Sequence, residues 1–177
     1  MVDSTCASGL KIGIGGIKLS PELVQYTFVC PLDQASRSGK ILNSIAAKAI
    51  NLPFLSLSAT ADEARVSFCV TVENSTIVRH LIADGLDQSQ SIHSTSSVGT
   101  FSVFPHRYNF DLLGQLLTHL ADAGIVIYGM CSSISALTVV IDFTCQEEAI
   151  RALAPYIELP ANHAPFRQEF DIRQISP

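Results

Sequence analysis

The 177-residue sequence has few charged residues, no block of like charge and no long apolar run. Charged residues make up 15% of the chain and leave a net charge of -5, so we do not expect a nucleic-acid partner. No apolar run approaches the roughly 18 residues of a membrane helix, and the first residues do not resemble a signal peptide. The five cysteines are odd in number and widely spaced, which favours a reduced chain over a disulfide framework. These absences predict a cytoplasmic protein with no membrane partner.

The sequence also lacks the short motifs that mark common enzyme and metal sites. It contains no G-x-S-x-G elbow, no H-E-x-x-H helix, no C-x-x-C pair and no phosphate-binding G-x-x-x-x-G-K-[ST] loop. A dinucleotide-binding glycine loop is followed by a helix, but the glycines at 13–16 are followed by an apolar stretch that ends at a proline. They therefore indicate a bent strand. Four histidines recur every 13 residues, a spacing that fits no single helix face or strand ladder: His80, His93, His106 and His119. We therefore expect no catalytic residue, no metal and no cofactor.

Apolar residues make up 47% of the chain and follow the periods of helices and strands. From Gly99 onward the expected elements are a strand at 100–104, a helix at 109–123, strands at 125–128 and 137–143, and a helix at 144–157. This order begins a ferredoxin-like unit. Gly124 stops the first helix, because glycine takes the left-handed conformation at no steric cost. Thr144 and Glu147 have the spacing of a capping box for the second helix.

The first half of the chain predicts a similar series of elements. They are a bulged strand at 10–19, a strand at 23–30, a helix at 39–50, strands at 52–57 and 66–72, a helix from Asn74 or Ser75 to Gly85, and a weak strand at 91–98. Five blocks of this half align with five blocks of the other, at an offset that drifts only from 71 to 75 residues. The aligned apolar positions predict two cores: Ile41, Leu42, Ile45, Phe68 and Val70 in copy one, and Leu116, Leu117, Leu120, Val139 and Ile141 in copy two.

Several of these stretches resemble ACT domains. His119–Ile127 looks like the junction between the first helix and the second strand in that family. Ser132–Asp142, followed by Glu147–Leu153, resembles the second ACT copy in the regulatory region of aspartate kinases. Ala49–Leu52 and Ala64–Val72 are similar to the first copy.

The resemblance covers about residues 16–160 and implies an α+β fold. Two ACT-type copies of the ferredoxin-like βαββαβ kind would each have an antiparallel sheet with the helices on one face. The implied parts are 1–19, an N-terminal segment whose strand joins the second copy's sheet; 20–98, the first copy; 99–160, the second copy; and 161–177, a C-terminal tail. The apolar residues of the tail predict either an edge strand or a loose end. The kinase catalytic domain itself is absent from this sequence.

The function that the resemblance implies is that of a non-catalytic regulatory module. It would bind a small ligand, an amino acid in the first place, and signal allosterically. The alternative is a small enzyme or metal-binding protein on a ferredoxin-like frame, because this frame hosts many functions. The resemblance also implies a homodimer, and the alternative is a monomer in which the two copies cover each other's sheet faces. The mildly polar faces away from the helices carry Ser67, Cys69, Thr71, Thr138 and Val140.

The candidate ligand site is the start of the first predicted helix, where the ACT resemblance also places effectors. The amino end of a helix offers unpaired N–H groups that suit a carboxylate. Gly39 leaves room for close approach, Ser38 can cap the helix, and Asp33 can face an ammonium group. Asn51, at the start of the next strand, offers an amide donor and acceptor. We expect Asp33, Ser38, Gly39 and Asn51 to line an amino-acid site; the alternative is an exposed loop satisfied by Ser38 and water.

Overall fold

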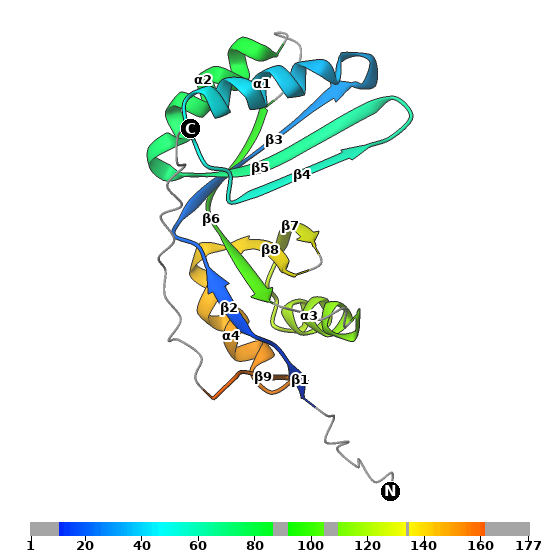
Figure 1. The fold of residues 1–177 in the computed structure, drawn as a ribbon, viewed down its shortest axis with the longest axis vertical. Helices are drawn as coiled ribbons and strands as arrows, with labels where there is room; N and C mark the ends of the chain where they lie inside the picture. Colours follow the sequence, from blue (N-terminus) through cyan, green and yellow to red (C-terminus); the bar gives the residue numbers. More distant parts are fainter. Residues whose placement is uncertain (1–10, 87–91, 105–109, 134, 162–177) are drawn as a thin grey trace, which may run out of the picture.

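The computed structural model describes residues 11–86, 92–104, 110–133 and 135–161 (Figure 1). Their main sheet has seven strands: six follow the order β4-β5-β3-β6-β8-β7, and β2 pairs with β6. A separate parallel pair joins β1 (Ile12–Gly13) to β9 (Ile157–Glu158). The predictions for His106 and for the tail beyond Ala161 lie outside the described residues.

Copy one is a four-stranded antiparallel sheet with both helices on one face. Its strand order, β4-β5-β3-β6, is that of a ferredoxin-like unit. Tyr26, Phe28 and Phe68 face the helices, and the ring centroid of Phe68 lies 6.1 Å from that of Tyr26 and 6.4 Å from that of Phe28. The elements in chain order are β3 (Leu23–Pro31), α1 (Ser36–Ala47), β4 (Phe54–Ala59), β5 (Glu63–Thr71), α2 (Ser75–Gly85) and the first half of β6 (Ile92–Phe104).

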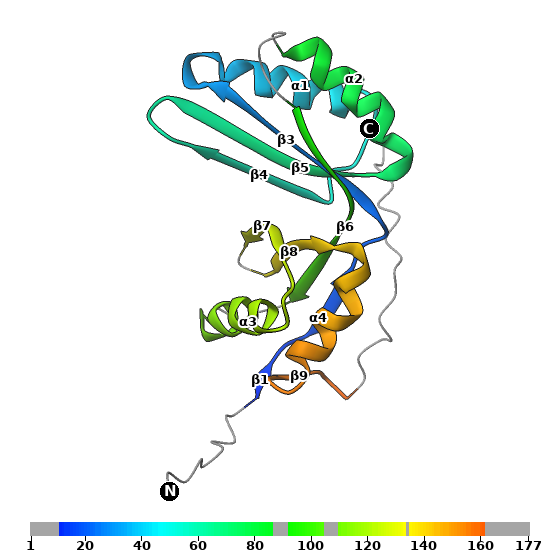
Figure 2. The same cartoon turned by 180° about the vertical axis from the view of Figure 1, so that it is seen from behind.

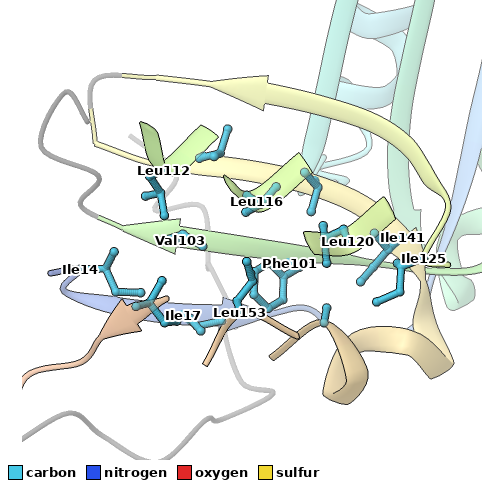
Figure 3. Close-up of a cluster of buried hydrophobic side chains, with 14 of the residues drawn as sticks. Ile14, Ile17, Phe101, Val103, Leu112, Leu116, Leu120, Ile125, Ile141 and Leu153 are labelled. Carbon is cyan, nitrogen blue, oxygen red and sulfur yellow. The ribbon is translucent and has the colours of Figure 1, made fainter. Parts of the chain in front are cut away.

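Copy two repeats this plan but takes one strand from the N-terminal segment. Its order is β7-β8-β6-β2, because β2 (Gly16–Leu19) runs antiparallel to the second half of β6, with Gly16 opposite Phe104. This is the position that the ACT resemblance implied for the strand. Figure 3 shows the core between this sheet and its helices, where Leu116 and Leu120 point toward Phe101. The remaining elements are α3 (Phe110–Asp122), β7 (Ile127–Ser132), β8 (Leu137–Asp142) and α4 (Gln146–Leu153).

The strand β6 belongs to both copies, where the sequence predicted two separate strands. Its first half pairs with β3, and its second half pairs with β8 and β2. The register with β3 shifts between Leu23 and Gln25, and Ser97 takes a positive φ of 53°. Such a bulge bends a strand without ending it. The expected boundary between residues 98 and 99 therefore lies inside one continuous strand.

The predicted core positions are confirmed, and most of them are fully buried. Eight of the ten expected residues are at most 1% exposed, whereas Leu42 and Leu117 are half-buried. Leu117 packs against the core of copy two. The buried positions of each helix recur at helical spacing, as in α3 with Leu112, Leu116 and Leu120. The apolar period therefore identified the buried faces of α1 and α3.

The helix stop at Gly124 is confirmed, because this residue follows α3 with a φ of +72°. The predicted capping box of Thr144 and Glu147 is wrong. Asp142 accepts hydrogen bonds from the backbone nitrogen of Thr144 at 2.9 Å and from its hydroxyl at 2.6 Å, ahead of α4. Both bonds hold the pKa of Asp142 below its usual value. The helix α2 begins at Ser75, one of its two expected starts, and the side chain of its N-cap residue, Asn74, does not cap it, because the amide donates to the Thr71 hydroxyl instead.

The sheet faces that carry no helices meet each other near β6. Figures 1 and 2 show that the helices of the two copies lie on opposite outer sides, so the open faces of the sheets point inward. A third buried cluster fills the region where they meet: Leu23, Phe54, Cys69, Val98 and Val140. A Cβ at Gly129 of β7 would lie 3.0 Å from the ring of Phe54 in β4. The two copies therefore cover part of each other's inner face.

Candidate functional site

The turn between β3 and α1 is built from residues that cannot continue a strand. Pro31 has no backbone N–H, and a short 3-10 turn, Leu32–Gln34, follows it. The backbone nitrogen of Leu32 donates to the carbonyl of Asp62 at 2.8 Å, which ties this turn to the loop between β4 and β5. The helix α1 then begins at Ser36, and its N-cap residue, Ala35, has no side chain that can cap it.

The structure corrects the predicted role of Ser38. The helix α1 begins at Ser36 instead of Gly39, so Ser38 lies within the first helical turn. Its side chain is 2% exposed, and its hydroxyl lies 3.3 Å from the thiol sulfur of Cys30. It therefore stabilises the contact between α1 and β3 and does not cap the helix. The N-cap residue of α1 makes no side-chain cap hydrogen bond, and the backbone nitrogen of Ser38 donates to the carbonyl of Ala35 at 3.1 Å.

Gln34 is a functional candidate that the sequence reasoning missed. Its Oε1 atom is buried and has no hydrogen-bond partner among the described residues. An unsatisfied buried carbonyl oxygen costs about 1–3 kcal/mol, so such an atom in a native turn indicates a missing donor. Asp33, the preceding residue, is exposed in the same turn. The sequence could not reveal this feature, because no pattern of residues indicates whether the side-chain amide of Gln34 points inward or outward.

The four predicted site residues do not all lie together. Asp33 and Gly39 are exposed near the start of α1, and a Cβ at Gly39 would meet nothing within 4 Å. Asn51 is also exposed, but it lies beyond the other end of α1, just ahead of β4. A helix of 12 residues spans about 18 Å. Within one molecule, Asn51 and Asp33 therefore lie at opposite ends of copy one.

The edge strand β4, which β5 separates from β3, presents exposed apolar side chains. Within the described part of the chain, β4 pairs only with β5, so its outer edge is free. Leu55 and Leu57 are 44% and 59% exposed on the helix side of the sheet. Such an edge is a ready template for pairing with another strand.

Two other concave regions lie in copy two. One has a volume of about 720 Å³ and runs along α4 beside Leu19. The other, of about 450 Å³, runs along α3, where the rings of His119 and Tyr156 stack at a centroid separation of 3.5 Å. The described residues include no group of three or more His, Cys, Asp or Glu side chains that could hold a metal ion. Among the same residues, no helix is long and apolar enough to cross a membrane.

No protein-family model and no curated protein matches the sequence. Solved structures, by contrast, match the fold. The ligand-free regulatory subunit of aspartate kinase from Thermus thermophilus gives a TM-score of 0.72 at 15% identity, covering 82% of this chain and 99% of that chain. A structure of the aspartokinase alpha and beta subunits gives a TM-score of 0.69 at 20% identity, covering 79% of this chain and 95% of that chain. The aspartate kinase from Synechocystis gives 0.72 at 17% identity, covering 86% of this chain but only 29% of the kinase.

These matches define the architecture as a tandem ACT-type fold. The chain has the same fold as regulatory subunits of aspartate kinases, as the resemblance in the sequence predicted. At these low identities the likeness concerns the fold alone. The function must therefore be argued from the chemistry of the turn between β3 and α1.

Proposed function

We propose that this chain is a non-catalytic regulatory module of the cytoplasm that binds a free amino acid at the start of α1 and signals its presence allosterically. The observation that carries the proposal is the buried, unpaired Oε1 atom of Gln34 beside a helix start that no side chain caps. A free amino acid carries both an acceptor and a donor that suit this helix start. Its carboxylate can accept from the first N–H groups of α1, and its ammonium group can donate to Gln34.

Asp33 and Gly39 complete this arrangement. Asp33 supplies a carboxylate in the same turn as Gln34, so it favours a ligand with an ammonium group. Gly39 keeps the outer face of the first helical turn free of a side chain. Ser38 acts indirectly, because its contact with Cys30 fixes the start of α1 against β3.

Asn51 takes part in the site if two molecules pair through β4. An antiparallel pairing of two β4 strands, centred between Ser56 and Leu57, sets Asn51 of one molecule opposite Asp62 of the other. Asp62 accepts the hydrogen bond from Leu32 that anchors the ligand turn. A homodimer of this kind would bring the amide of Asn51 toward the site and cover the apolar edge of β4.

Calorimetric titration with the common amino acids tests the ligand site. We expect one of them to bind, and both Gln34→Leu and Gly39→Val to weaken its binding by about tenfold or more. Gly114→Val is the matched control, because Gly114 also lies in an exposed helical turn with nothing within 4 Å of its Cβ position. The proposal fails if no amino acid binds at millimolar concentration, or if all three variants bind as the wild type does.

Sedimentation at micromolar concentration tests the dimer. Leu57→Lys places a charge on the free edge of β4 and should give a monomer. Val126→Lys is the control, because Val126 is equally exposed, at 59%, but precedes β7 in copy two. A wild-type chain that is monomeric throughout the concentration range would exclude this interface, and Asn51 would then have no part in the site.

A further inference from the structure

The helix α3 carries a polar groove on its outer surface. We call it the α3 groove; its volume is about 450 Å³, and Tyr156 forms one of its walls. Figures 1 and 2 show α3 on the outer side of copy two, away from the inner sheet face. The residues that α3 contributes are spaced by three or four positions or are neighbours, so they form one stripe along the helix. They are exposed or half-buried: Asp111, Gly114, Gln115, Thr118 and His119.

The two ends of this stripe carry groups of opposite character. Asp111 is exposed in the first turn of α3, and His119 lies in the last turn. The imidazole of His119 stacks on the ring of Tyr156, with 3.5 Å between the centroids and 10° between the planes. Stacking holds a face of the imidazole, whereas the nitrogen atoms that donate hydrogen bonds lie on its edge. The groove therefore offers a carboxylate acceptor at one end and an imidazole donor at the other.

Two antiparallel copies of α3 complement each other. Asp111 and His119 lie four residues on either side of Gln115, or about 6 Å along the helix axis. When a two-fold axis passes beside Gln115, Asp111 of each molecule faces His119 of the other, and the two Gln115 amides face each other. This contact gains two carboxylate–imidazole hydrogen bonds and an amide pair, because an amide both donates and accepts. The antiparallel helix dipoles favour the same orientation.

We propose that the occupant of the α3 groove is a second copy of this chain, with the two α3 helices antiparallel about Gln115. The helix has 13 residues and is about 20 Å long, so the contact is small and its dissociation constant lies at about 0.1–1 mM. The contact belongs to copy two and is independent of the amino-acid site. Where two molecules also pair through β4, the two contacts link dimers into larger assemblies.

Sedimentation equilibrium from about 10 μM to about 1 mM tests the proposal. Every protein compared carries Leu57→Lys, which removes pairing through β4. This background should be a monomer at the lower concentration and form dimers toward the upper one. Asp111→Arg should weaken the association at least about tenfold, because it removes the acceptor for His119. The charge-swapped double variant Asp111→Arg/His119→Glu should restore it.

Asp84→Arg is the matched control, because it makes the same charge change at an exposed position of α2. It should associate as the background does. Weaker association with Asp111→Arg alone, recovered in the double variant, supports the contact between two α3 helices. The contact is overturned if the background stays monomeric to 1 mM, if Asp111→Arg and Asp84→Arg associate equally, or if the charge swap fails to restore the dimer.

Discussion

Two glycines within helices make opposite contributions to stability. Gly85 is the last residue of α2, and a Cβ there would overlap the buried side chain of Ile41 in α1. Gly114 lies inside α3, where a Cβ would meet nothing within 4 Å. The close approach of α1 and α2 requires a glycine at position 85, whereas Gly114 only adds flexibility to the unfolded chain.

We therefore predict that Gly85→Ala lowers the free energy of unfolding by about 1–3 kcal/mol, because the core must shift to admit the methyl group. Gly114→Ala should raise it by about 0.5–1 kcal/mol through helix propensity. Urea unfolding followed by circular dichroism measures both changes. If the two variants shift stability in the same direction, the close contact at Gly85 is not a constraint.

At the level of single residues, the sequence predicted burial better than it predicted polar contacts. Leu120 follows from the apolar period of its helix, and it is buried as predicted. Ser38, by contrast, is of a residue type that often caps helices, but it is buried in the core. The reason is that the helix starts three residues earlier than expected. A cap depends on where the backbone leaves the helical conformation, and the side-chain pattern does not define that point.

The junction between the copies is held by one polar side chain at the start of α4. Gln146 is 3% exposed, and its Nε2 atom donates to the carbonyl of Ser20 at 3.2 Å and to that of Thr100 at 3.3 Å. The Ser20 hydroxyl accepts from the backbone nitrogen of Thr100 at 2.8 Å. Gly99 has no room for a side chain, because a Cβ there would overlap the amide of Gln146. Hydrogen bonds thus link the end of β2, the middle of β6 and the start of α4.

Replacing this amide should weaken the junction selectively. We predict that Gln146→Leu lowers the free energy of unfolding by about 1–3 kcal/mol, because an apolar side chain of similar size removes the amide donor to the carbonyl of Ser20 and leaves that of Thr100 only its bond from the backbone nitrogen of Ser20. Glu147→Leu, at the exposed neighbouring position, should stay within about 0.5 kcal/mol of the wild type. Equal effects at the two positions in thermal unfolding would show that the amide is not needed.

Element types were predictable because each half of the chain shows clear apolar periods, and five aligned blocks of the repeat supported the assignments. The continuity of β6 was not predictable. The serine-rich stretch before Gly99 has few apolar residues, since both its faces are only partly buried. Its strand conformation depends on long-range pairing with β3, which local sequence does not encode.

For the whole molecule, the sequence predicted the two-copy architecture, whereas the candidate site stays a prediction. The ACT resemblance pointed to the start of the first helix; Asp33 lies in the turn after β3, and Gly39 lies near the start of α1. It also grouped Asn51 with them, although α1 separates the two ends of copy one. The order of residues along the chain cannot show whether a site lies within one molecule or is completed by a second molecule. Pairing of two molecules through β4 would bring Asn51 of one toward Asp33 and Gly39 of the other.

The contact between the inner sheet faces decides whether the two copies move as one body. Phe54 of copy one packs against β7 of copy two, and Cys69 is fully buried beside it. Burial raises the pKa of the Cys69 thiol to about 12, above the roughly 8.5 of a free thiol. The stabilisation linked to this shift is therefore complete below about pH 8.5 and is lost as the pH rises toward 12.

Opening this contact should expose the thiol. We predict that Phe54→Ala lowers the free energy of unfolding by about 3–5 kcal/mol through the cavity it leaves, and that Cys69 then reacts with iodoacetamide at pH 8. In the wild type Cys69 should stay unreacted, while the exposed Cys131 is modified at the same rate in both proteins. Mass spectrometry of the labelled peptides gives both rates. If Cys69 of the wild type reacts as fast as Cys131, the inner faces separate in solution, and the described links left for a ligand signal from copy one to copy two are β6 and the connection between β2 and β3.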